Sequence, residues 1–136
     1  MGNMTNSRNL TSKLGWKNKE PKLKLIEMNN LVVKVPTQEK YDLLMQICQT
    51  GGWRWNNRVM DPIENNYWNN LKSQTCVTTS NGLLVASKYY WNKHNYGKIS
   101  FNDFINIQGL SKLDLKEINN YFEENFSDRV SKGIKN

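Results

Sequence analysis

The clearest pattern of apolar positions in the chain predicts an α-helix that ends at a pair of glycines. The apolar side chains fall at i, i+3, i+4 and i+7, on one helical face, and they are Tyr41, Leu44, Met45 and Cys48. Thr37 is a suitable N-cap, because its hydroxyl can accept a hydrogen bond from the first turn. We therefore expect a helix from there to about Thr50, with Gly51 or Gly52 as its C-cap.

A short strand is predicted directly after those glycines. Trp53, Arg54 and Trp55 alternate with the period of a strand, so both indoles face one side and the guanidinium faces the other. Large aromatic side chains dominate small cores, which favours the indoles as core residues. Arg54, with Arg58 after it, is then the candidate for binding a partner from the opposite face.

Two further stretches carry strong strand signals. The β-branched run at residues 31–35 predicts a strand that ends at Pro36. The dipeptide Asn81-Gly82 tolerates positive φ at both positions, which is the backbone conformation that a tight hairpin turn needs. We expect it to join two strands at residues 74–80 and 83–87.

The second half of the chain predicts three helices and one more short strand. Residues 88–94 are expected to be helical, and a short strand follows around Ile99. Ser100 and Asp103 have the spacing of a capping box, which opens the next helix. The last helix is expected to begin near Asp114 and to present one apolar face, formed by Leu115, Ile118, Phe122 and Phe126.

This order of elements predicts an α+β fold with a small mixed β-sheet, a central hairpin and helices on one face. The strand–helix–strand start favours a right-handed crossover between parallel strands. The expected domain limits are a basic, flexible arm at residues 1–22, a single domain at 23–127 and a frayed tail at 128–136. Residues 56–66 are polar and are predicted to form a loop or a lid.

The positive charge is concentrated at the N-terminus. The chain has a net charge of +7, and residues 1–24 hold six Lys or Arg against one Glu. Basic segments of this kind often contact nucleic acid or an acidic protein surface. A solvated tail has the same composition, so charge alone leaves both readings open. If the arm binds, the expected contacts are Lys13, Trp16, Lys17 and Lys19.

Few residues are candidates for catalysis. A nucleophilic site needs a nucleophile, a base and an orienting group that converge, and His94 is the only histidine. Asp61 and Glu64 are the one acidic pair in the predicted loop, where a solvated turn also explains them. Cys48 and Cys76 are too few for a structural zinc site. We therefore predict no enzyme activity, no metal and no cofactor.

Location is inferred from hydropathy. No apolar run approaches the length that crosses a bilayer, and the first residues are polar where a signal peptide would be apolar. We expect a soluble, cytoplasmic protein without membrane contact, in which both cysteines are reduced.

Aromatic residues beside cations favour binding over catalysis. Lys88 and Lys93 flank an aromatic run, just as arginines accompany the predicted tryptophan strand. Aromatic faces stack on bases and cations hold phosphates, so a nucleotide or a single strand could bind in this way. Tyr67 and Trp68 lie in a polar stretch rich in Asn, and we expect them to mark a partner surface.

Five short motifs resemble those of small accessory proteins of phages and prophages. They are Val35-Pro36-Thr37, Gly52-Trp53-Arg54-Trp55, Cys76-Val77, Tyr89-Tyr90, and Ile99-Ser100-Phe101 with Phe104. The resemblance covers about residues 31–105 and implies a similar fold and a mobile-element origin in a bacterial host. Several small phage proteins of this size counter host defence.

The expected function is therefore a non-enzymatic phage or mobile-element protein that inhibits host defence by binding a host protein or nucleoprotein. The alternative is direct binding of nucleic acid or of a small nucleotide, which includes sequestration of a signal nucleotide. A nucleotide hydrolase is the weakest of the three hypotheses. Whether the chain forms a homo-oligomer is left open.

Overall fold

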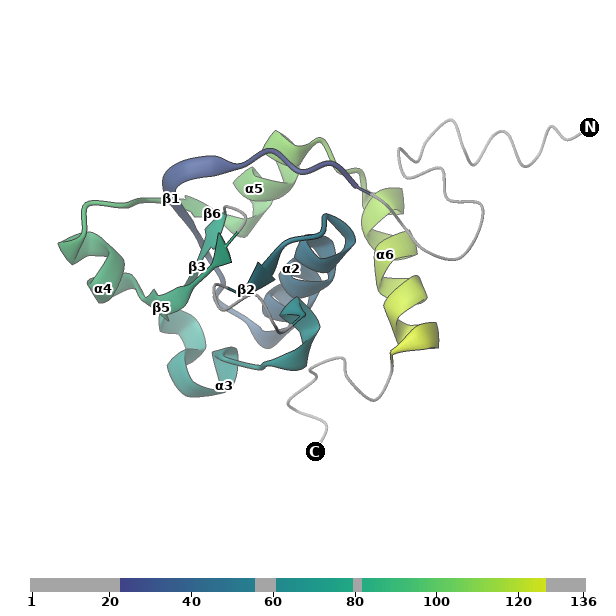
Figure 1. The fold of residues 1–136 in the computed structure, drawn as a ribbon, viewed down its shortest axis with the longest axis horizontal. Helices are drawn as coiled ribbons and strands as arrows, with labels where there is room; N and C mark the ends of the chain where they lie inside the picture. The colour runs from purple at the N-terminus through teal and green to yellow at the C-terminus, as the bar shows by residue number, and fades with distance from the viewer. Residues whose placement is uncertain (1–22, 56–60, 80–81, 127–136) are drawn as a thin grey trace, which may run out of the picture.

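The computed structural model describes residues 23–55, 61–79 and 82–126, which form an α+β fold (Figure 1). These residues contain five α-helices, a mixed four-stranded sheet and a separate parallel pair of strands. The predicted α+β class is confirmed. The predicted arm at 1–22, residues 56–60 of the predicted loop or lid at 56–66, and the predicted tail at 128–136 lie outside the described residues.

The central strand of the larger sheet is β1, Met28–Lys34. It pairs antiparallel with β3, Thr75–Thr79, and parallel with β6, Gly97–Ser100. The edge strand β5, Val85–Ser87, pairs antiparallel with β3, so the order is β5-β3-β1-β6. Both hydrogen-bonding edges of β1 are therefore occupied.

Apolar side chains cover both faces of this sheet. Successive strand residues point to opposite faces, and Val33 and Val77 lie in the main core while Val32 and Cys76 lie in a second cluster. Trp91 closes that second cluster from a short helix. The prediction of helices on one face is therefore wrong, because the second face is also apolar and needs a cover.

Three helices cover the first face: α2, Gln38–Thr50; α5, Phe101–Gln108; and α6, Lys112–Asn125. The predicted stripe of α2 is fully buried, and the Thr37 hydroxyl caps the helix by accepting from the N–H of Lys40. Two shorter helices lie between α2 and α5 in the chain: α3 at Trp68–Leu71 and α4 at Lys88–Lys93.

The two glycines after α2 have different roles. Gly51 is the C-cap, and a Cβ there would lie 2.4 Å from Leu25 Cδ1, so a larger residue would force the Leu25 side chain to move. Gly52 has a φ of 80°, a conformation that glycine adopts without strain. The close approach at Gly51 lets the segment before β1 pack along the end of α2, where the N–H of Leu23 donates to the carbonyl of Thr50.

The expected crossover between the first two strands is not formed. The strand β2, Arg54–Trp55, pairs in parallel with β4, Gly82–Leu83, and stays outside the larger sheet. Trp53 and Trp55 are both 5% exposed, which confirms the indoles as core residues. The parallel partner of β1 is β6 instead.

The hairpin of β3 and β5 exists, but its register is not the predicted one. A two-residue turn at Asn81-Gly82 would place Val77 opposite Ala86, whereas the structure pairs Val77 with Val85. The reason is that Gly82 and Leu83 pair with β2, so they are not available as turn and strand of a tight hairpin.

The boundaries of the later helices follow their caps. Ser100 accepts from the N–H of Asp103 at the start of α5, as the spacing predicts. The helix α6 begins at Lys112, earlier than expected, because Ser111 is its N-cap and forms a reciprocal capping box with Asp114. Ser111 and Asp114 have the spacing of a capping box in the sequence, and the prediction of a start near residue 114 did not use it.

Gln108 ties the segment before β1 to α5. Its Nε2 donates to the carbonyl of Ile26 and its Oε1 accepts from the N–H of Ile26, both at 2.8 Å. Gln108 is 5% exposed, so these two bonds are shielded from solvent on its side.

Gln108→Ala should lower the free energy of unfolding by about 1–3 kcal/mol, because two partly buried hydrogen bonds are lost together. Urea titration of the full chain measures the change. Asn106→Ala, at an exposed position of the same helix, is the control and should stay within about 0.5 kcal/mol of the parent. Equal effects of the two substitutions would contradict the role given to Gln108.

Candidate functional site

The described part of the chain is electrically neutral. It contains ten Lys or Arg and ten Asp or Glu, so the net charge of +7 belongs entirely to residues outside it. The predicted arm contacts, Lys13, Trp16, Lys17 and Lys19, and the predicted Arg58 lie outside the described residues. A charged binding site among the described residues therefore depends on where their charges lie on the surface, because their net charge is zero.

Arg54 is not an isolated cation. Its Nε lies 3.1 Å from Asp61 Oδ1 in an ion pair, and its Nη1 donates to the carbonyl of Trp53. Asp61 precedes the short helix η1, Pro62–Glu64, whose Ile63 is buried in the core. The part of the predicted lid at 61–66 is thus packed against the domain.

Tyr67 and Trp68 are structural residues as well as surface residues. The indole Nε1 of Trp68 donates to the carbonyl of Val35 at 2.9 Å, and Tyr67 packs edge-on against Trp55 with ring centroids 4.9 Å apart. Both side chains are half-buried and pack against the main core. Trp68 thus reaches the main chain of Val35 and Tyr67 packs on the tryptophan strand, so only part of each side chain remains exposed for a partner.

The predicted Lys88 and Lys93 belong to an exposed group of cations and tyrosines. Tyr89 and Tyr90 are 66% and 46% exposed, and among the described residues they are the one pair of neighbouring large hydrophobic side chains that are both exposed. The Nζ of Lys88 lies 5.9 Å from the ring centroid of Tyr89. Lys98 of β6 donates to Asn92 of α4. We define the α4 surface as Lys88, Tyr89, Tyr90, Lys93 and Lys98.

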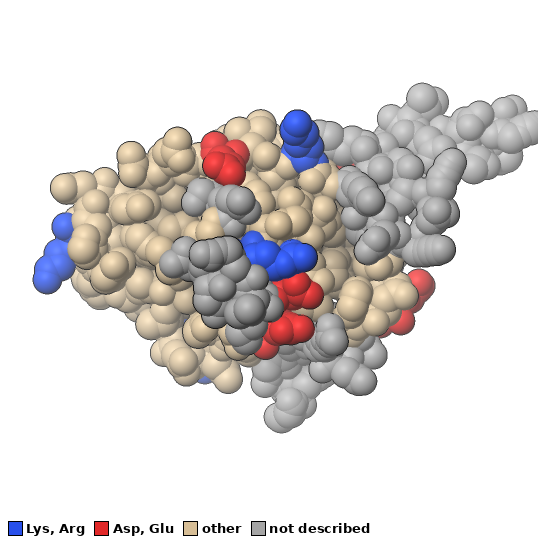
Figure 2. Space-filling view, in the orientation of Figure 1, with Lys and Arg blue, Asp and Glu red and all other residues tan. Residues whose placement is uncertain are grey.

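No carboxylate neutralises this surface from its own part of the chain. Residues 65–102 contain four lysines and neither Asp nor Glu. Figure 2 shows Lys and Arg atoms at the left end of the molecule, where Figure 1 places α4, without Asp or Glu atoms beside them. The described domain is neutral overall, but its charge is unevenly distributed, because residues 65–102 carry only lysines and all of the acidic residues lie in other parts of the chain.

A buried anchor holds α4 in place. Trp91 is 2% exposed, and its Nε1 donates to the carbonyl of Cys76 at 3.1 Å. Its ring also packs against Tyr96, with centroids 4.7 Å apart. Because Trp91 points inward, the preceding Tyr89 and Tyr90 are left on the outside of the short helix. His94 is exposed, and its ring lies tilted against Tyr90, with ring centroids 4.3 Å apart.

Neither cysteine is suited to nucleophilic chemistry. Both are free and buried. Burial raises the pKa of the Cys48 thiol well above its ordinary value. Burial also raises the pKa of the Cys76 thiol, although the nearby ammonium groups of Lys98, Lys34 and Lys88 oppose this rise. A nucleophilic cysteine needs the opposite shift, toward the thiolate.

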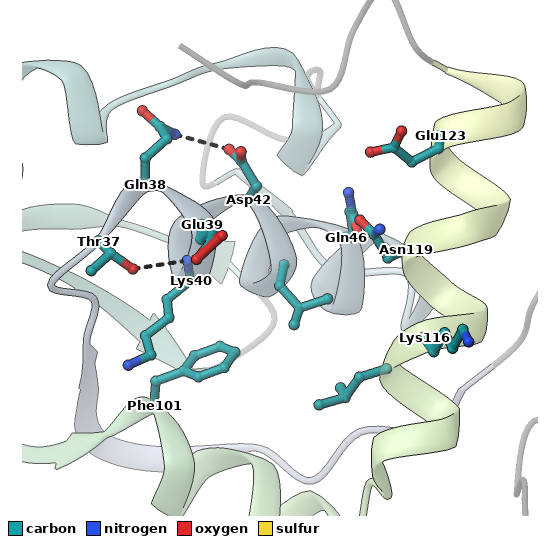
Figure 3. A pocket seen from close by; sticks show the side chains of 12 residues that line it. Thr37, Gln38, Glu39, Lys40, Asp42, Gln46, Phe101, Lys116, Asn119 and Glu123 are labelled. Atoms are coloured by element: carbon teal, nitrogen blue, oxygen red, sulfur yellow. Dashed lines mark hydrogen bonds between the residues drawn. The ribbon is translucent and has the colours of Figure 1, made fainter. Parts of the chain in front are cut away.

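A second feature is a groove of about 860 Å³ between α2 and α6, which we call the α2–α6 groove (Figure 3). Leu43, Leu115 and Phe101 supply apolar lining. Gln46 also lines the groove and projects from α2 toward α6. It is 1% exposed, and neither its Nε2 nor its Oε1 has a hydrogen-bond partner.

Sequence reasoning missed Gln46. The sequence signal is its position: Gln46 follows Leu44 and Met45 and lies within a stretch of α2 that is buried on more than one helical face.

Among the residues that the structure describes, no group of three or more His, Cys, Asp or Glu could hold a metal ion. None of the described helices combines the length and apolar character that a bilayer-spanning helix requires.

Both thiols should resist a disulfide reagent such as dithionitrobenzoate in the native protein and react fully in denaturant. The raised thiol pKa values also predict a pH dependence. Above the ordinary thiol pKa of about 8.5 the unfolded chain releases protons that the folded chain keeps, so stability falls as pH rises. Rapid native reaction at pH 8 would contradict the burial of these groups.

Gln46→Met should raise the free energy of unfolding by about 1–2 kcal/mol. Methionine has a similar length, and the substitution removes two buried polar atoms that lack partners. Thermal or urea unfolding measures the effect. A clear loss of stability would mean that the Gln46 amide has partners in the isolated protein.

Comparison with known proteins gives no match to a family model, a curated protein or a solved structure. The resemblance to phage accessory proteins therefore stays a prediction.

Proposed function

We propose that the chain is a non-enzymatic binding protein of a phage or other mobile element that attaches to a host nucleoprotein through its α4 surface. The observation that carries this proposal is the grouping of lysines and exposed tyrosines on α4 and β6, in a region without carboxylates. Cations and exposed tyrosines together suit a surface on which phosphates and bases are accessible.

The N-terminal residues of the chain carry charge of the same sign as the α4 surface. Residues 1–22 carry five Lys or Arg against one Glu, so a polyanionic partner would attract both the arm and the α4 surface. Such attraction raises the rate of encounter more than the final affinity. Inhibition of host defence rests on the resemblance alone, and the absence of enzyme activity stays a prediction.

Direct binding of single-stranded nucleic acid is the second candidate. Tyr89 and Tyr90 favour it, because exposed rings next to lysines form the kind of platform on which bases stack. The two candidates use the same surface and differ in whether plain nucleic acid is sufficient. A sequestered nucleotide has less support on this surface, because neither the α2–α6 groove nor the hollow beside Gly51 is lined by these lysines.

The charge-removing pair Lys88→Gln and Lys93→Gln tests the surface. For a labelled oligothymidylate, loss of two phosphate contacts should make the slope of log affinity against log salt shallower by about 1.4. The control pair, Lys112→Gln and Lys116→Gln, removes the same charge from exposed positions on α6, at the opposite end of the fold from α4 (Figure 1), and should leave the slope unchanged.

The outcomes separate the candidates. Binding of the oligonucleotide at low salt that depends on the α4 lysines supports direct recognition. No oligonucleotide binding, with capture of a nucleic-acid-containing host complex that only the α4 variant loses, supports the nucleoprotein partner. If the α4 pair and the control pair behave alike in both assays, the role of the α4 surface is wrong.

A further inference from the structure

We propose that the α2–α6 groove binds an extended peptide segment of a partner protein, and that Gln46 recognises one residue of that segment through its main-chain N–H and C=O groups. This site is separate from the α4 surface. Figure 1 places α4 and α6 at opposite ends of the fold, and the sheet lies between the clusters that they cover.

The buried amide of Gln46 defines the chemistry of the ligand. Its Nε2 and Oε1 both lack partners, so the ligand that satisfies the site must offer an acceptor and a donor side by side. In an extended peptide, the C=O and N–H of one residue point to the same edge and are exchanged as a pair with a neighbouring strand. A phosphate or carboxylate would satisfy the Nε2 group and leave the Oε1 atom facing negative charge.

The charges that line the groove also favour a peptide over a nucleotide. The lining contains the carboxylates of Glu39, Asp42 and Glu123 and the ammonium groups of Lys40 and Lys116. Asp42 accepts a bond from Gln38, so part of its capacity is used within the domain. Glu39 is exposed at this lining, so a neutral or basic segment meets less repulsion beside it than a nucleotide phosphate does.

The remaining lining suits apolar side chains on either side of the paired residue. Leu43 and Leu115 are half-buried on facing helices, and Phe101 closes one end from the start of α5. A volume of about 860 Å³ lies within the usual range for ligand sites. A segment with a basic residue between two apolar residues therefore matches the groove.

The test uses the full ¹⁵N-labelled chain and the capped peptide acetyl-Leu-Lys-Leu-amide. We expect saturable changes in the NMR resonances of the Gln46 side-chain amide and of neighbouring residues on α2 and α6. An analogue with an ester oxygen in place of the lysine N–H should bind about tenfold more weakly. Gln46→Met should weaken binding of the amide peptide at least tenfold and abolish its preference over the ester.

Gln74→Met is the matched control, because Gln74 has a buried Oε1 without a partner but lies on the η2 helix, Lys72–Gln74, away from the groove. It should leave peptide binding unchanged. The proposal is overturned if the peptide produces no saturable shift, or if amide and ester bind equally. It is also overturned if adenosine monophosphate alone shifts the Gln46 resonance, or if deletion of residues 1–22 changes that resonance before peptide is added.

Discussion

The fold depends on the burial of β1 on both faces while both of its edges are hydrogen-bonded. Val32 and Val33 are each completely buried, and they face different apolar clusters. Neighbouring strands on either side satisfy the main-chain groups that this burial removes from water. Consequently α2, α5 and α6 pack on one side and α4 on the other, which separates the two candidate binding surfaces.

Local patterns predicted the elements well because their causes are local. The stripe of α2, its threonine cap and the glycines after it are all encoded within a few residues, and the structure confirms each of them. The same is true of the capping box that starts α5. The burial of Trp53 and Trp55 followed from the size of the indole, which a small core can rarely leave exposed.

Long-range features could not be predicted in the same way. The pairing of Leu83 with Trp55 shifts the register of the β3–β5 hairpin, and nothing near Asn81-Gly82 signals it. The ion pair of Arg54 with Asp61 likewise forms only after the chain has folded. By contrast, the uninterrupted apolar run around Val32 and Val33 was a readable sign that both faces of β1 are covered.

The central claim is that the α4 surface is where a partner docks. Hydrogen–deuterium exchange of the chain, free and in the complex captured from its host, tests it most directly. The account predicts slower exchange in the complex across residues 87–98, with the backbone of β1 equally protected in both states. Protection confined to residues 61–74 or to α2, with residues 87–98 unchanged, would contradict the claim.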